Sequence, residues 1–375
     1  MARLDEICLI NMGQSPDSSS YNENCDGLPF FQGNADFGQK HPTCRVWCNA
    51  PVKIADLGDI LISVRAPIGA LNVADRKCCI GRGLAALRVI NNVCNQEYLW
   101  YALETKVNEL NSKGIGSTFK AISKSILEET EIPLPPIEDQ VHFAAVLNKV
   151  SELISIRKKQ LDKLDELVKS RFVEMFGDPK TNENGYVVKK LGELANKISD
   201  GVHAKPTYTE SGRPFLSVVN INRGVINFNG CKFVSEEAYQ KMIKSTHPEY
   251  GDVLYTKVGA TYGIPAFVDT DIEFCLYVSV CLIKPKHELI NSKFLALSMA
   301  LPYVKSQADS RIKGIGVPDL HLNQISEFNI VCPPCKDQEE YVNFVERVDK
   351  VKLSINQSLE KLETLKKALM QKYFE

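Results

Sequence analysis

The sequence lacks the short motifs that identify most nucleotide-dependent and hydrolytic enzymes. It contains no GxxxxGK(S/T) phosphate loop, no GxGxxG after a predicted strand, no HExxH and no GxSxG. The Asn-Pro-Pro-Tyr motif of amino-methyltransferases is also absent. Without a motif for a nucleotide, a metal or a nucleophile, we expect no catalytic residues, no metal and no cofactor on this chain.

Long apolar runs are also missing. No apolar stretch follows Met1, so the sequence gives no sign of a signal peptide. The strongest apolar run in the second half, residues 276–283, is far too short to span a bilayer. We therefore expect a cytoplasmic protein that makes no contact with a membrane.

The chain has no excess of charge of either sign. Its formal net charge is −1, and residues 1–137 carry −2 whereas residues 178–335 carry +1. A DNA-binding domain usually presents a basic face. Balanced totals leave room for such a face but predict weak DNA binding by the chain alone, or help from a basic partner.

Twelve cysteines are present, and several of them lie in apolar stretches that favour buried free thiols. Cys332 and Cys335 have the CxxC spacing of a metal or redox site. Their equivalents in the repeat described below are Leu134 and Ile137, which are apolar. This correspondence favours a packing role.

The sequence contains the same order of motifs twice. Pro-Pro followed by Asp-Gln occurs in residues 135–140 and again in residues 333–338, an offset of 198 positions. Lys-Gly-Ile-Gly occurs at 113–116 and again at 313–316. In a chain of 375 residues, such a repeat predicts two related globular units, each followed by a long helical segment.

Both helical segments carry a heptad pattern, with apolar side chains at most a and d positions. These positions are Leu147, Val150, Ile154, Leu161, Leu164, Val168 and Met175, then Val345, Val348, Ile355, Leu359, Leu362, Leu369 and Tyr373. Arg157, Arg171, Lys352 and Lys366 interrupt the pattern. A parallel homodimer would stack these like charges, so we expect the first helix to pair antiparallel with the second and hold the two units at opposite ends of a rod. In the alternative, each helix packs on its own globular unit.

The fold class predicted is α+β, with two repeated mixed α/β domains joined by two long helices that form an antiparallel coiled coil. We expect domains at 1–137 and 178–335, and helices at 138–177 and 336–375. The predicted strands are 29–32, 59–64, 85–90, 132–134, 214–221, 252–257, 277–283 and 327–331. One helix is expected in each domain, at 96–110 and at 292–307, the latter capped by Asn291 or Ser292.

Polar loop residues of the kinds that contact bases and phosphates are the candidate DNA-binding residues. Arg on guanine and Asn or Gln on adenine are the usual major-groove contacts. In the first domain the candidates are Gln32, Asn34, Arg65, Arg82, Lys113, Ser117, Thr118 and Lys120. In the second domain they are His203, Lys205, Tyr208, Asn220, Asn222, Arg223, Lys257, Tyr262, Arg311 and Lys313.

Over essentially its whole length the sequence resembles the DNA-specificity subunits of type I restriction-modification systems. The segments that carry the resemblance are GDILISVRAPIG (58–69), CIGRGLAALR (79–88), GSTFKAIS (116–123), LPPIEDQ (134–140), SRFVEMFGDP (170–179), DGVHAKPTYTESGRPFLSVVNI (200–221), YGDVLYTKVGATYG (250–263) and LYVSVCLIKP (276–285). One departure is that the second Lys-Gly-Ile-Gly continues as Val-Pro-Asp instead of Ser-Thr-Phe. The second loop therefore lacks the two hydroxyl groups that follow the motif in the first.

The resemblance implies that each domain reads one half of a bipartite site in double-stranded DNA. It also implies that the helices dock two methyltransferase subunits, which bind S-adenosylmethionine and methylate adenine. A restriction or motor subunit, where present, would use ATP and magnesium. Two alternatives stay open: a coiled-coil scaffold whose end domains bind proteins, and the specificity subunit of an orphan or type IIB-like methyltransferase.

Overall fold

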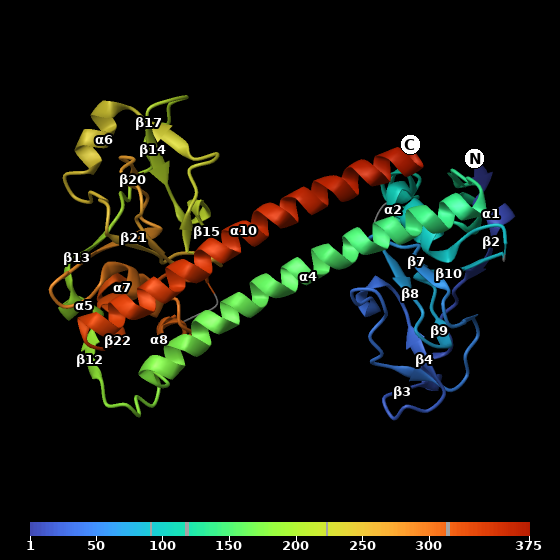
Figure 1. Cartoon of the computed structure of the whole chain (residues 1–375), viewed down its shortest axis with the longest axis horizontal. Helices are drawn as coiled ribbons and strands as arrows, with labels where there is room; N and C mark the ends of the chain where they lie inside the picture. Colours follow the sequence, from blue (N-terminus) through green and yellow to red (C-terminus); the bar gives the residue numbers. More distant parts are fainter. Residues whose placement is uncertain (91, 117–119, 223, 313–315) are drawn as a thin grey trace. The chain divides into compact units, whose positions relative to one another are not determined.

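The computed structural model describes residues 1–90, 92–116, 120–222, 224–312 and 316–375 (Figure 1). The chain divides into two compact units. Unit 1 comprises Met1–Lys159 and Asn356–Glu375, and unit 2 comprises Gln160–Ile355. Each unit thus combines a globular part with one portion of each long helix, and the predicted α+β class is confirmed.

The globular part of unit 1 is built on a four-stranded antiparallel sheet with the order β2-β10-β7-β8. Its elements are β1 Ala2–Arg3, α1 Leu4–Ile7, β2 Cys8–Met12, β3 Tyr21–Asn22, β4 Leu28–Phe31, β5 Trp47–Cys48, β6 Ile54–Ala55, β7 Ile60–Ser63, β8 Leu71–Val73, β9 Cys78–Ile80, β10 Leu84–Val89, α2 Gln96–Ser112, α3 Lys124–Glu128 and β11 Glu131–Ile132, with short 3-10 turns η1 Ser18–Ser20 and η2 Asn34–Asp36. Strand β7 is buried along its whole length, as its apolar run Ile-Leu-Ile predicts.

A second sheet of unit 1 has the order β3-β5-β4-β9-β6, in which β4 and β9 run parallel. It joins the first sheet where the chain passes from β9 into β10 through Gly81 and Gly83. A Cβ on Gly83 would lie 2.4 Å from the carbonyl oxygen of Gln32. Glycine is therefore required where these strands cross closely.

Unit 2 repeats this frame with its own four-stranded sheet in the order β13-β21-β18-β19. Its elements are β12 Val187–Lys190, α5 Leu191–Leu194, β13 Ala195–Asp200, β14 Arg213–Leu216, η3 Val218–Asn220, β15 Ile221–Asn222, β16 Val225–Ile226, β17 Lys232–Val234, α6 Glu236–Met242, β18 Val253–Thr256, β19 Pro265–Phe267, β20 Cys275–Leu276, β21 Val280–Pro285, α7 Ser292–Met299, α8 Pro302–Arg311, α9 Leu322–Ser326 and β22 Asn329–Cys332. The parallel pair β14–β20 corresponds to β4–β9 of unit 1.

The repeated Asp-Gln motif fixes the start of one helix in each unit. Gln140 accepts a hydrogen bond from the backbone N–H of Asn95 (2.8 Å) and donates to the carbonyl of Pro135 (2.8 Å). Gln338 makes the same bonds, from the N–H of Asn291 (2.8 Å) and to the carbonyl of Pro333 (2.7 Å). Asn95 and Asn291 in turn cap α2 and α7, so the predicted Asn291 cap is confirmed.

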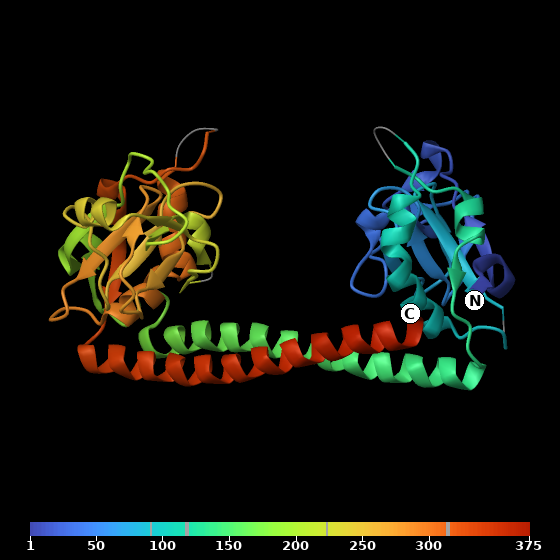
Figure 2. The ribbon, with the colours of Figure 1, turned by 90° about the horizontal axis from the view of Figure 1, so that it is seen from above.

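Helices α4 Ile137–Phe176 and α10 Cys335–Phe374 are antiparallel neighbours within each unit (Figure 1). In unit 1, the ring of Phe143 stacks on Tyr373 at 4.0 Å, and Lys158 pairs with Glu363 at 3.1 Å. In unit 2, Phe172 packs edge-on against Tyr341 at 5.4 Å. Figure 2 shows that the globular part of unit 1 lies on one side of its helix segments.

The charged residues within the heptad pattern have individual partners. Arg171 pairs with Glu340 at 2.9 Å, and Lys352 pairs with Asp165 at 2.6 Å. Lys366 instead reaches Glu104 of α2 at 3.3 Å. These pairs explain how charges are tolerated along a seam whose apolar positions are buried or half-buried.

Three predicted elements are wrong in extent. The single helix expected at 292–307 is two helices, α7 and α8, because Pro302 lacks the N–H that a continuous helix needs and disfavours a helical Leu301. The strand expected at 214–221 ends at Leu216, where a 3-10 turn begins. The strand expected at 277–283 begins only at Val280, because Tyr277 makes an isolated bridge to Val202 and a turn follows it.

Candidate nucleic-acid interface

A recess of about 550 Å³ in unit 1 brings together three of the predicted residues: Gln32, Asn34 and Arg65. Gln32 and Asn34 lie in one turn, after β4 and in η2, whereas Arg65 comes from the distant segment after β7. The recess is also lined by Tyr21, Glu23, Phe30, Gly33, Ala35, Asp36, Arg45, Val46 and Gly83. Arginine, asparagine and glutamine side chains of this kind match the donors and acceptors on base edges.

A carboxylate organises the rim of this recess. Asp36 accepts hydrogen bonds from the backbone N–H groups of Gln32 (2.8 Å) and Gly33 (3.4 Å). Its other oxygen accepts from Arg45 at 2.6 Å, and the same guanidinium donates to the carbonyl of Ala35 at 3.0 Å. The ring of Tyr21 stacks on Phe30 at 4.7 Å. The recess is therefore ordered by contacts that exist without a ligand.

The remaining candidates of unit 1 lie outside the lining of this recess. The side chains of Arg82 and Lys120 are exposed, and the backbone N–H of Arg82 donates to Ser15 at 3.3 Å. Lys113 is also exposed but pairs with Glu109 at 2.6 Å, so its charge is partly compensated. Ser117 and Thr118 lie outside the described residues.

In unit 2, the loop that follows β13 carries three candidates. His203 and Lys205 are exposed, and the ammonium of Lys205 lies 5.9 Å from the ring centre of Tyr208. Lys232 covers the same ring at 4.2 Å. Two cations on one aromatic ring place positive charge beside this loop.

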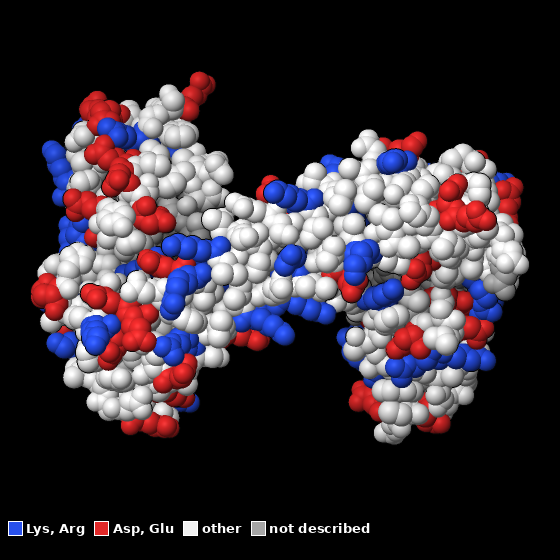
Figure 3. Space-filling view, in the orientation of Figure 1, with Lys and Arg blue, Asp and Glu red and all other residues white. Residues whose placement is uncertain are grey.

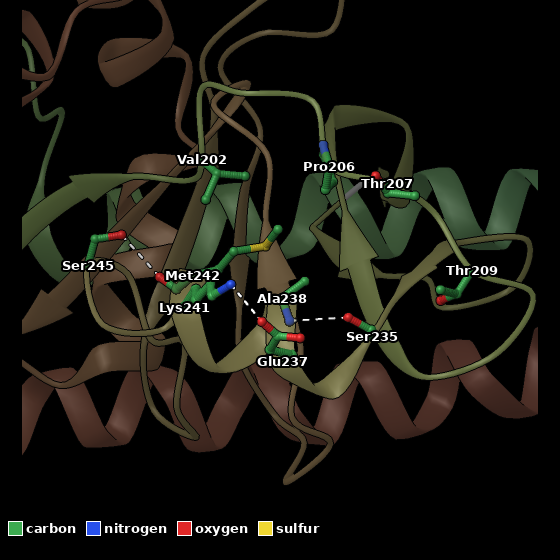
Figure 4. A pocket seen from close by; sticks show the side chains of 10 residues that line it. All are labelled: Val202, Pro206, Thr207, Thr209, Ser235, Glu237, Ala238, Lys241, Met242 and Ser245. Carbon is green, nitrogen blue, oxygen red and sulfur yellow. Dashed lines mark hydrogen bonds and ion pairs between the residues drawn. The ribbon is translucent and has the colours of Figure 1, made fainter.

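A recess of about 500 Å³ lies between this loop and α6. Figure 4 shows the side chains that line it. Val202 and Met242 give it apolar walls, whereas Thr207 and Thr209 bring hydroxyl groups. The Lys241 ammonium at its edge pairs with Glu237 at 2.7 Å. This recess thus differs in chemistry from the arginine-containing recess of unit 1.

Several other candidates of unit 2 are bonded to groups of the protein itself. Asn220 is buried and accepts a hydrogen bond from the N–H of Ser217 at 3.0 Å, so it shapes a turn. The guanidinium of Arg311 donates to the carbonyls of Gln307 (2.7 Å) and Glu327 (3.2 Å). Tyr262 donates to Asp309.

Lys257 is the most buried of these side chains, with 4% of its surface exposed. Its ammonium lies 3.4 Å from Asp319 and 3.6 Å from Asp200. Burial raises the pKa of Asp200, an effect that the positive charge of Lys257 opposes. Asn222 is exposed at the end of β15, whereas Arg223 and Lys313 lie outside the described residues.

Arg45, Asp36, Tyr21 and Phe30 are absent from the residues predicted from the sequence. No spacing rule joins Arg45 to Arg65, because Arg45 precedes β5 of the second sheet and Arg65 follows β7 of the first, so only the folded arrangement of both sheets brings them to one recess. The available signal was Asn34-Ala35-Asp36, a run typical of a turn that accepts backbone hydrogen bonds.

The surface charges are mixed. Figure 3 shows Lys and Arg interspersed with Asp and Glu over the visible face of each unit. This pattern agrees with the balanced composition of the chain. Among the residues that the structure describes, no cluster of three or more His, Cys, Asp or Glu side chains is placed to hold a metal ion. None of the described helices has both the length and the apolar character needed to cross a membrane.

The decisive comparison is with protein families. The model of the type I restriction modification DNA specificity domain matches residues 1–166 and again residues 183–366. The chain belongs to this family. The two matches correspond to the two halves of the repeat, so the specificity domain is present twice.

Individual specificity subunits are similar to this chain over different lengths. A putative type I restriction enzyme MjaX specificity subunit of Methanocaldococcus jannaschii is 43% identical over 43% of this chain, a match that spans only 38% of that relative. The MjaIX specificity subunit of the same organism is 26% identical, covering 89% of this chain and 81% of the relative. The crystal structure of a type I S subunit from M. genitalium has the same fold, with a TM-score of 0.63, 16% identity and coverage of 100% and 95%.

Proposed function

We propose that this specificity subunit recognises double-stranded DNA, with each unit reading one half of a bipartite site. The observation that carries the proposal is the unit 1 recess, in which Gln32 and Asn34 of one turn meet Arg65 of a distant segment. Such side chains discriminate bases by bidentate hydrogen bonds in the major groove. The repetition of the specificity domain supports one half-site for each unit.

Partner subunits complete this proposal. Two methyltransferase subunits dock along the helices and supply S-adenosylmethionine chemistry, and a restriction or motor subunit joins where one is encoded. Supporting this, α4 and α10 leave several large apolar side chains about half exposed, including Ile156, Leu167, Val173, Leu353 and Leu365. Apolar side chains in otherwise charged helices are typical of surfaces that bind protein.

The chain itself is proposed to be non-catalytic and cytoplasmic. Its role is to position the partners on DNA, with no cofactor of its own. Balanced charge on the units means that phosphate neutralisation by this chain alone is modest, so stable binding draws on the partners.

Exchange of one unit tests the proposal. Residues 1–137 are replaced by the matching segment of a relative, and the chimera is co-expressed with the methyltransferase subunit. Single-molecule sequencing then maps methylated adenines. One half of the methylated motif should change and the other half should stay. A matched chimera that exchanges residues 178–335 should alter only the opposite half.

A change in both halves after a single exchange would contradict independent reading by the two units. Binding of the wild-type complex to specific and scrambled duplexes with equal affinity would contradict sequence recognition altogether. That result would favour the alternative in which the chain is a protein-binding scaffold.

A further inference from the structure

Arg45 lies at the recess of unit 1 in a setting that differs from an ordinary surface arginine. Its side chain is 61% exposed, yet one end of the guanidinium is held by Asp36 at 2.6 Å and by the carbonyl of Ala35 at 3.0 Å. Asp36 itself is only 15% exposed. The charge of Arg45 is therefore available to a ligand while its position is fixed from behind.

Asp36 fixes Arg45 to the same turn that presents two other recess residues. The carboxylate oxygen that does not bind Arg45 accepts from the N–H of Gln32 at 2.8 Å and from Gly33 at 3.4 Å. Asn34 follows directly in η2. Since one carboxylate serves both the turn and the arginine, Gln32, Asn34 and Arg45 form one preorganised group. Preorganisation lowers the entropy lost when a ligand is bound.

The charges of the recess decide which part of DNA fits there. Arg45 and Arg65 line it together with Asp36 and Glu23, so two cations are offset by two carboxylates. A phosphate would meet the repulsion of both carboxylates. A base edge is neutral, offers acceptors to arginine and, on cytosine, a donor to a carboxylate. The lining thus favours a base edge over the backbone.

We propose that Arg45, positioned by Asp36, reads a guanine of the half-site that unit 1 recognises. The inference rests on the proposed function and adds a specificity-determining residue to it. A guanidinium has five N–H donors in one plane, and those that Asp36 and Ala35 leave free can donate to the O6 and N7 acceptors of guanine. Asp36 is the positioning residue, because its contact orients the fork without needing to touch DNA.

The test uses the assembled complex with its methyltransferase subunits. Its target is taken from the methylated motif, and each guanine of the unit 1 half-site is replaced in turn. Three variants are compared with wild type: Arg45→Ala, Arg45→Lys and Asp36→Asn. The control is Arg3→Ala, which removes a similar exposed arginine held by Asp5 at 2.9 Å but outside the recess lining.

Arg45→Ala should weaken binding to the target roughly 5- to 150-fold and abolish discrimination at a single guanine. Arg45→Lys should fail to restore that discrimination, because an ammonium keeps the charge but lacks the planar fork. Asp36→Asn keeps an acceptor for the turn and should give a smaller loss at the same guanine. Arg3→Ala should bind as wild type.

A different result would overturn the role of Arg45 while leaving the proposed function intact. In this result, Arg45→Ala lowers the affinity for every duplex equally and Arg45→Lys restores it. Such a pattern would mean that Arg45 contacts a phosphate. Unchanged discrimination in Arg45→Ala would also overturn it. Wild-type discrimination in Asp36→Asn would refute the positioning role of Asp36. If the wild-type complex bound all duplexes equally, the proposed function would fail, and the role of Arg45 with it.

Discussion

Equivalent positions at the same edge of the two sheets carry opposite chemistry. In unit 1 the positions are Met12, Val64 and Ala121, and in unit 2 they are Asp200, Lys257 and Asp319. The backbone is the same: Val64 accepts from the N–H of Ile122 at 2.9 Å, and Lys257 accepts from the N–H of Leu320 at 3.0 Å.

The repeated frame therefore depends on backbone pairing and not on the side chains at these positions. An apolar trio needs no partners, whereas a buried ammonium must be neutralised. Lys257 meets this requirement through Asp200 and Asp319. Unit 2 therefore contains a network of charges at the positions where unit 1 has apolar side chains.

The largest predicted effect comes from breaking this network. Lys257→Met leaves Asp200 buried without its cation and should destabilise unit 2 by about 3–5 kcal/mol. Hydrogen exchange measured on peptides of unit 2 and of unit 1 would locate the loss. The triple variant Asp200→Met, Lys257→Val, Asp319→Ala copies unit 1 and should recover most of it. A triple variant as unstable as the single one would refute the equivalence of the two trios.

The loss should depend on pH. The pKa of Asp200 lies above 3.8 because of burial, so its contribution to stability falls as pH rises through that folded pKa. Removing the Lys257 charge raises that pKa further. The deficit of Lys257→Met should therefore be greatest at neutral pH and shrink as acid protonates Asp200. The triple variant, which has no carboxyl at this position, serves as the control and should lack this component.

A smaller loss of stability, equal in the two units, is expected at the Asp-Gln motif that both units share. Gln140→Ala and Gln338→Ala each leave a half-buried N–H, of Asn95 and of Asn291, without its acceptor. Each substitution should cost about 1–3 kcal/mol in its own unit. Local hydrogen exchange at the starts of α2 and α7 would measure this. A large cost in one unit and none in the other would show that the shared motif has diverged in its role.

The sequence was sufficient for the repeat, the long helices and most strands, because these depend on local patterns. The heptad positions from Leu147 to Met175 are all buried or half-buried. The break at Pro302 was also readable in principle, since proline limits a helix by local chemistry. The family resemblance likewise rests on contiguous segments.

The candidate site was predicted less completely, because it depends on pairing between distant strands. Gln32, Asn34 and Arg65 do share a recess, but Arg45 joins them only through the β3-β5-β4 pairing. Lys257 was predicted to be a loop cation, but it is buried. The prediction failed because residue type alone does not reveal a carboxylate partner 62 positions away. The DNA contacts of all these residues stay predictions.

The salt dependence of the affinity for DNA can be compared between lysines of the two units. Lys120 in unit 1 and Lys205 in unit 2 are exposed cations on loops. Lys120→Ala and Lys205→Ala should each reduce the slope of log affinity against log salt by about one, without altering the motif. Lys180→Ala removes another exposed lysine beside the helix end and is the control. An unchanged slope in both loop variants would place the DNA face elsewhere.

The smallest predicted effect concerns the charged seam positions of α10. Lys366 pairs with Glu104 at 3.3 Å and lies 5.4 Å from the ring centre of Tyr101. Lys352 pairs with Asp165, which is 61% exposed, whereas Glu104 is 33% exposed. Solvent screens exposed pairs, so each should contribute less than about 1 kcal/mol.

The Lys366 pair should still be the stronger of the two, because its carboxylate is less solvated and the ring adds a cation–π contact. Double-mutant cycles of Lys366→Ala with Glu104→Ala, and of Lys352→Ala with Asp165→Ala, measure the two coupling energies in chemical unfolding. The same cycle for the more exposed pair Lys158–Glu363 gives the coupling energy of a pair that solvent screens strongly. A coupling in the Lys352 pair that exceeds that of the Lys366 pair would mean that geometry, not exposure, decides how the helix charges stabilise each unit.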